Sequence, residues 1–226
     1  MSSRKVKIAL TINILIFILT VVASVIMFAD IKFMKGEFEV LESSKLGMLK
    51  FFTVDSNIFM GIVALIFAID EYKLLKGKIE SISKFKYILK LMSTTAVGLT
   101  FFTVFLYLGP IASDGIYSML LNSNLFFHLI IPVLSMINFI LVEKTAQIKQ
   151  INCFAGVAPS FVYATAYLIN VLVHMDNGKV SPMYDWYYFV QNGVWTAVLV
   201  VPFMAAMTYL LCIALYKLNR LGLEKK

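Results

Sequence analysis

The sequence has little charge and little cysteine for its length. Only 15% of its 226 residues are charged, whereas 60% are hydrophobic and the mean hydropathy is +0.85. Soluble domains carry about 25% charged residues, so this composition excludes a water-soluble fold of this size and predicts that lipid solvates much of the chain. The two cysteines, Cys153 and Cys212, lack metal-site spacing and a disulfide framework. We expect both to be buried structural thiols.

The chain also lacks the short motifs of soluble enzymes. It has no G-x-S-x-G elbow, no H-E-x-x-H zinc motif and no glycine-rich phosphate loop. We therefore expect no cofactor and no metal site. The formal net charge of +7 would suit a nucleic-acid binder, but the basic residues lie in short segments between apolar runs. Basic residues in such positions orient membrane proteins, so we expect no nucleic-acid partner.

Six apolar runs approach the length of about 20 residues that crosses a bilayer as a helix. They cover residues 8–29, 48–68, 88–108, 119–142, 151–173 and 192–216. The first run is too long for a signal-peptide core and precedes no small-residue cleavage site, so we expect a retained helix. No linker or internal repeat divides the chain. The sequence therefore predicts one all-α domain over residues 1–226, a polytopic bundle of six transmembrane helices.

The basic residues predict how this bundle is oriented. If the N-terminus is inside, only five of the 20 Lys and Arg residues fall on the outer side: Lys32, Lys35, Lys45, Lys50 and Lys179. The inner loop between the second and third helices receives the most, Lys90 included. Excess Lys and Arg mark cytoplasmic loops, so both termini are predicted to be cytoplasmic in a multi-pass protein of the cell membrane. The last outer loop holds aromatic residues suited to the headgroup level: Tyr184, Trp186, Tyr187, Tyr188 and Phe189.

Polar residues inside membrane helices are costly, and here they concentrate toward the outer side. In the second helix, Thr53, Ser56 and Asn57 share one face and Asp55 lies on the same turn. Three further helices also carry polar residues. The third has Thr103 and Tyr107, the fourth has Asn124 and His128, and the fifth has Tyr167, Asn170 and His174. We expect these stripes to meet in one outer-leaflet pocket.

Thr53 and His128 are predicted at similar depths, which suggests nucleophilic chemistry. A neutral imidazole can take the proton of a hydroxyl and so activate it as a nucleophile. Asn57, Asn124 or the amides of the first turn of the second helix could bind the oxyanion that follows. Ser56 and Asp55 could support the site. The residues leave open whether His128 or His174 is the base.

Each of these residues also has a structural interpretation. Thr53 can bond back to a carbonyl of the preceding turn, and Ser56, Asn57 and Asn124 can join helices by hydrogen bonds. A transporter or channel, or a lipid-binding scaffold, therefore stays open beside the enzyme.

Four stretches match motifs of a known family. They are KFFT at 50–53, NLFFHLIIP at 124–132 followed by Glu143, HMDNG at 174–178 and YDWYYF at 184–189. In these the chain resembles the androgen-induced-protein family of six-span membrane hydrolases, and its TVDSN run at 53–57 resembles the bacterial branch. The mammalian members cleave fatty acid esters of hydroxy fatty acids with a threonine and a histidine inside the bilayer.

The resemblance implies that Thr53 is the nucleophile and His128 the base. Together with the residues, it predicts an intramembrane threonine-dependent hydrolase that cleaves an ester bond in an amphipathic lipid. Its partners would be this lipid or fatty-acid ester substrate and the membrane lipids, and nothing in the residues indicates an oligomeric state.

Overall fold

Six long helical segments cross the molecule in the computed structural model, which describes residues 2–36, 45–112, 115–187 and 194–223. The spans run over Ser3–Phe28, Phe52–Leu75, Lys84–Leu108, Ser123–Val142, Gln150–Val173 and Val198–Arg220. Within the described ranges there is no β-strand, only an isolated bridge between Asp176 and Lys179. The predicted all-α bundle of six membrane-spanning helices is confirmed.

Four of the spans are built on single long helices and two are interrupted. The long helices are α1 (Ser3–Phe28), α2 (Phe52–Leu75), α7 (Cys153–Val173) and α8 (Val194–Arg220). In the third span, α3 (Lys84–Thr103) continues into a π-helical turn at Val104–Leu108 and the short α4 (Gly109–Ile111). The fourth span consists of α5 (Ser123–Leu125), the π-helical turn η4 (Phe126–Ile130), α6 (Ile131–Ile137) and the π-helical turn η5 (Asn138–Val142).

The helix ends differ from the apolar runs for identifiable reasons. The runs predicted to start at Met48 and Met119 begin with short 3₁₀ turns, which cover Lys45–Lys50 and Gly115–Leu120. Both methionines are buried, which explains their place in an apolar run. The second helix continues past its predicted end to Leu75, because Asp70 and Glu71 beyond that end are buried and have partners in Lys86 and Asn13. The predicted start of the last span and the predicted interfacial residues Tyr188 and Phe189 lie outside the described residues.

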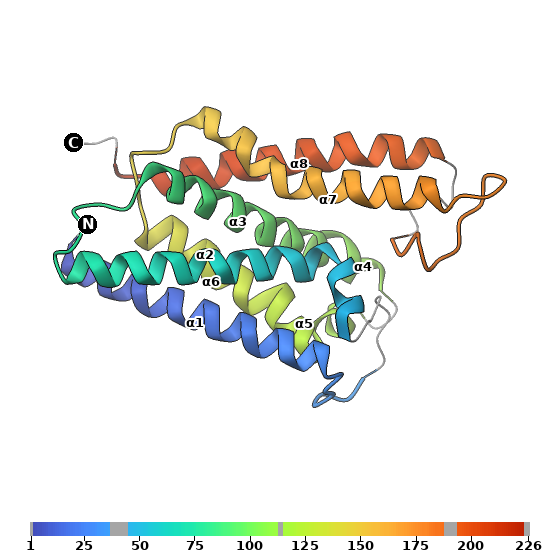
Figure 1. The fold of residues 1–226 in the computed structure, drawn as a ribbon, viewed down its shortest axis with the longest axis horizontal. Helices are drawn as coiled ribbons and strands as arrows, with labels where there is room; N and C mark the ends of the chain where they lie inside the picture. The colour runs from blue at the N-terminus through green and yellow to red at the C-terminus, as the bar shows by residue number, and fades with distance from the viewer. Residues whose placement is uncertain (1, 37–44, 113–114, 188–193, 224–226) are drawn as a thin grey trace.

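Helix α3 lies at the centre of the bundle, with α1 and α2 on one side and α7 and α8 on the other (Figure 1). α1 runs along α2, and α7 runs along α8. The start of α1 and the end of α8 lie at the same end of the bundle, here called the terminal end (Figure 1). This placement agrees with both termini being on one side of the membrane. We refer to the opposite end as the loop end, which is the predicted outer side.

The surface around the sides of the bundle is apolar. Large hydrophobic side chains are exposed on α1, α7 and α8, including Ile18, Val25, Val162, Leu199 and Phe203. Water-soluble monomers rarely expose such continuous apolar surfaces. The exposed side chains are therefore suited to contact lipid, and the polar residues are left to the interior.

Candidate functional site

The buried imidazole of His128 lies in the π-helical turn η4, near the loop end of the fourth span. Its Nδ1 lies 2.6 Å from the main-chain carbonyl oxygen of Met119, which belongs to the preceding 3₁₀ turn. Because a carbonyl only accepts hydrogen bonds, Nδ1 donates here, and in the neutral ring Nε2 then has the free lone pair. A histidine held in this tautomer has the form that a general base needs.

The π-helical turn depends on Pro132 and Asn57. In a π-helix each carbonyl accepts from the amide five residues later, but the residue five after Phe127 is Pro132, which has no amide hydrogen. The side-chain amide of Asn57 donates to the Phe127 carbonyl instead, at 3.1 Å. Asn57 in α2 thus satisfies the carbonyl next to His128 in the neighbouring span.

Asn57 also contacts the turn of Thr53. Its Nδ2 donates to the Thr53 carbonyl at 2.7 Å, so one amide group joins the main chain at Thr53 to the main chain beside His128. The amide of Asn57 is fully buried, and its Oδ1 has no hydrogen-bond partner. Both donor hydrogens of Asn57 therefore serve the packing of these two turns in this structure, and neither is free for an oxyanion.

The Thr53 hydroxyl differs from three buried threonine hydroxyls elsewhere in the bundle. Thr20, Thr95 and Thr208 each donate to the carbonyl four residues earlier, at 2.7–2.9 Å. In the described part of the chain no such bond is formed by half-buried Thr53, the second residue of α2. The carbonyl of Lys50, one turn before it, accepts the Tyr163 hydroxyl instead. The back-bonded state considered for Thr53 from sequence is therefore not the one observed.

Aromatic side chains cover the start of α2. The Phe52 amide donates to the Tyr187 hydroxyl at 3.0 Å, and Trp186 Nε1 donates to the Tyr163 hydroxyl at 3.2 Å. The Tyr167 hydroxyl donates to the Asp185 carboxylate. Burial, with the nearby Asp55 carboxylate as a smaller cause, raises the pKa of Tyr187 above its usual value of 10.0. The phenol is therefore neutral at physiological pH, and it caps one of the first-turn amides that the sequence offered as oxyanion donors.

The remaining predicted residues fall into two groups. Ser56 is buried, with its hydroxyl 3.3 Å from that of Thr100 on α3, and Asn124 is buried in α5. Asp55 is half-buried in the first turn of α2. These three lie on the elements that carry Thr53 and His128.

The other group lies farther out. Asn170 is half-buried and donates to the Tyr184 carbonyl at 2.9 Å, and Thr103 is half-buried on α3. Tyr107 is 63% exposed, and His174 is exposed, with its ring stacked on Tyr184 at 3.7 Å. The structure does not bring Tyr107 and His174 to the buried group around His128. Of the two candidate bases, only His128 is buried.

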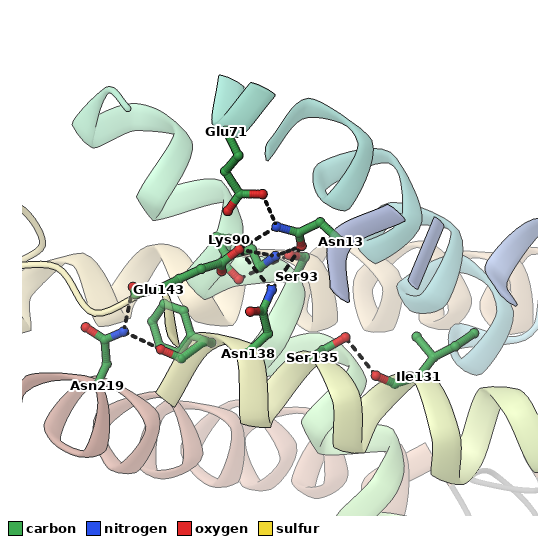
Figure 2. A network of polar contacts seen from close by, with 10 residues as sticks. Asn13, Glu71, Lys90, Ser93, Ile131, Ser135, Asn138, Glu143 and Asn219 are labelled. Atoms are coloured by element: carbon green, nitrogen blue, oxygen red, sulfur yellow. Dashed lines mark hydrogen bonds and ion pairs between the residues drawn. The ribbon is translucent and has the colours of Figure 1, made fainter. Parts of the chain in front are cut away.

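A second polar group, at the terminal end, was not anticipated. Five buried side chains from four spans form a group that we call the charge cluster (Figure 2): Asn13, Glu71, Lys90, Asn138 and Glu143. Lys90 Nζ lies 3.2 Å from Glu143 Oε1 and donates to Asn13 Oδ1 at 2.5 Å. The assignment of Lys90 to a cytoplasmic loop was therefore wrong. Its ammonium is fully buried because a carboxylate and an amide, which come from other spans, replace water around it.

A sequence signal for the charge cluster existed. Asn13 interrupts the apolar run of the first helix, and Glu71 and Lys90 each lie within a few residues of a predicted span end. Residues near span ends are usually solvated, so their positions along the chain could not distinguish a loop charge from a buried one.

The chain was also compared with known proteins. Searches against protein-family models, curated proteins and solved structures find no significant match.

Proposed function

We propose that this protein is an intramembrane hydrolase of the bacterial branch of the androgen-induced-protein family, located in the cell membrane. In this proposal Thr53 is the nucleophile and His128 is the base. One observation supports it above the others: the Asn57 amide joins the turn of Thr53 to the turn of His128. The fixed Nδ1 contact of His128 to the Met119 carbonyl leaves Nε2 as the proton acceptor.

The proposed substrate is an amphipathic lipid ester of the fatty acid ester of hydroxy fatty acid type. The Thr53 hydroxyl oxygen would form a bond to the ester carbonyl carbon while His128 Nε2 takes the hydroxyl proton. That proton would then pass to the departing alkoxide, which leaves as the hydroxy fatty acid, and the acyl group stays on Thr53. Water would attack the acyl-enzyme, with His128 again as the base, and release the fatty acid.

An apolar groove between α1 and α2 would give an acyl chain a place to lie. It has a volume of about 410 Å³ between α1 and α2, and Phe28, Met48, Ile58 and Gly61 are among its lining residues. Ile58 follows Asn57 in α2, whereas Thr53, Asn57 and His128 themselves do not line the groove. Because the groove opens on the lipid-facing surface, a substrate could enter sideways from the bilayer.

The test compares four single variants in lipid nanodiscs. We expect Thr53→Ala and His128→Ala to lose labelling by a fluorophosphonate activity probe and to lose hydrolysis of a fatty acid ester of a hydroxy fatty acid. Thr165→Ala and His174→Ala are matched controls, because Thr165 and His174 are exposed on α7 or at its end. We expect both controls to retain labelling and hydrolysis.

Two results would contradict the proposal. Hydrolysis at the wild-type rate by folded Thr53→Ala protein would exclude Thr53 as the nucleophile. Loss of activity in His174→Ala with full activity in His128→Ala would transfer the role of base to the exposed histidine.

A transporter is the second candidate, and the charge cluster favours it. Ionisable side chains inside membrane spans often belong to ion or proton pathways. Glu71 of this cluster lies near the end of α2, whereas Thr53 lies at its start. A transporter would show solute flux in proteoliposomes and no covalent adduct on Thr53.

A further inference from the structure

The charge cluster contains two carboxyl groups and one ammonium group. Glu71 is 0% exposed, Glu143 is 1% exposed and Lys90 is 0% exposed, so water does not solvate these charges. If both carboxyls were ionised, the group would carry one uncompensated negative charge in the interior. An isolated charge in a low-dielectric interior costs so much free energy that the group binds a proton or a counter-ion instead.

The hydrogen bonds show which carboxyl is matched by the ammonium. Glu143 Oε1 accepts from Lys90 Nζ at 3.2 Å, from Asn13 Nδ2 at 2.6 Å and from Asn138 Nδ2 at 3.0 Å. Three donors, one of them charged, stabilise the carboxylate form. Glu143 is therefore the ionised partner of Lys90.

The Glu71 carboxyl accepts fewer hydrogen bonds than the Glu143 carboxyl. Its Oε2 accepts from Asn13 Nδ2 at 2.9 Å, and no ion pair between Glu71 and an ammonium is formed in the described residues. Its Oε1 is buried without a hydrogen-bond partner, as are Glu143 Oε2 and Asn138 Oδ1. Glu71 Oε2 and Glu143 Oε1 accept from the same Asn13 Nδ2, at 2.9 and 2.6 Å, so the two carboxyls are neighbours. A hydrogen on Glu71 would thus have an acceptor oxygen at hand.

Other ionisable groups near the charge cluster do not supply the missing positive charge. On α2 and α3, Asp70 pairs with Lys86 at 2.5 Å, and the half-exposed Lys86 lies outside the buried group. Tyr87 on α3 interacts with both carboxyls but contributes no positive charge. On α8, Asn219 donates to the Glu143 main-chain carbonyl at 3.1 Å, and Arg220 donates to the Ile148 carbonyl at 3.3 Å.

We propose that the charge cluster is a proton-binding site, in which the Glu71 carboxyl holds one proton and forms a hydrogen bond with it to the Glu143 carboxylate. Lys90 and Glu143 then form a neutral pair, and the whole cluster is neutral. This inference does not depend on the proposed hydrolase activity. It assigns to the terminal end of the bundle a carboxylic acid that stays protonated at neutral pH.

The experiment is infrared spectroscopy of the full-length protein in lipid nanodiscs at neutral pH, with and without ¹³C-labelled glutamate. We expect a carboxylic acid C=O band that shifts with the glutamate label and on transfer to D₂O. The band should be lost in Glu71→Gln, because glutamine has the shape and neutrality of the protonated acid. Glu80→Gln is the matched control, since Glu80 is an exposed glutamate in the loop before α3, and it should retain the band.

Several outcomes would overturn the proposal. Absence of a label-sensitive acid band in the wild type would mean that both carboxyls are ionised. A band of unchanged intensity in Glu71→Gln would place the proton on another glutamate. A wild-type band that disappears when Na⁺ is added at constant pH would replace the proton with a metal cation. The wild-type spectrum alone decides the first and third outcomes, so the proposal stays testable if a variant fails to fold.

Discussion

The side-chain amide of Asn57 in α2 donates to the main-chain carbonyl of Phe127 in the fourth span, at 3.1 Å. The carbonyl is available because Pro132 has no amide hydrogen to offer it. One residue later the chain carries His128, and the same Asn57 amide donates to the Thr53 carbonyl. A sequence irregularity in one helix is thus complemented by a side chain of another, and this pairing joins the main chain at Thr53 to the main chain beside His128.

Replacement of Asn57 should test this linkage directly. Asn57→Ala would leave the Phe127 carbonyl buried without a partner, which costs about 1–3 kcal/mol. We expect a lower free energy of unfolding in lipid and a loss of the proposed hydrolysis at the same time. Ser56→Ala is the control, because the Ser56 hydroxyl also donates to the Thr53 carbonyl but its other partner in the described residues is Thr100 on α3, not the fourth span. Equal stability of Asn57→Ala and wild type would show that another group satisfies the Phe127 carbonyl.

The buried ion pair of Lys90 and Glu143 should be strongly coupled. Lys90→Met leaves the Glu143 carboxylate buried without its ammonium, and breaking a buried pair in this way costs about 3–5 kcal/mol. The double variant Lys90→Met with Glu143→Gln should recover much of that loss, because no buried charge is left unpaired. A double-mutant cycle of unfolding free energies measures the coupling. Additive effects of the two substitutions would mean that water reaches Lys90 in solution.

The close contact of α1 and α2 predicts unequal effects for two glycine substitutions. A Cβ at Gly61 would lie 2.8 Å from the branched Cγ2 of Thr20, whereas a Cβ at Gly98 would lie 3.3 Å from the flexible end of Leu211. Overpacking of this kind costs about 1–3 kcal/mol, so we expect Gly61→Ala to lower the unfolding temperature clearly and Gly98→Ala to lower it little. The reverse order would show that α1 moves away from α2 at little cost.

The stability that buried Tyr187 gives to the folded protein should decrease at high pH. Below pH 10.0, the ordinary tyrosine pKa, the neutral phenol accepts from the Phe52 amide, a bond worth about 1 kcal/mol. Because burial raises the pKa of the folded phenol, the unfolded chain ionises first as the pH rises, and the stabilisation is lost between pH 10.0 and the raised folded value.

We therefore expect wild type to be more stable than Tyr187→Phe near neutral pH, with a difference that shrinks above pH 10.0. Thermal unfolding of both proteins over this range measures the difference. A constant difference across the range would show that the phenol pKa is the same in both states.

Part of this architecture follows from the chain pattern alone. The thickness of the bilayer sets the length of an apolar run, so the six spans could be located within a few residues. The helical period places Thr53 and Asn57 on one face. This spacing was sufficient to predict a polar face on α2. The start of α2 shifted from Met48 to Phe52 because Phe51 is extended and separates a 3₁₀ turn from the helix, a break that the apolar pattern does not reveal.

Helix packing decided which polar side chains are buried. Lys90 and Lys86 are four residues apart in one helix, yet Lys90 is fully buried and Lys86 is half-exposed. The difference depends on Asn13 and Glu143, which come from spans far away in the sequence and meet Lys90 only in the folded bundle. Likewise, His128 is buried against a carbonyl while His174 lies on the surface. A local pattern specifies the direction of a side chain on its own helix, but its solvation depends on which neighbour replaces water around it.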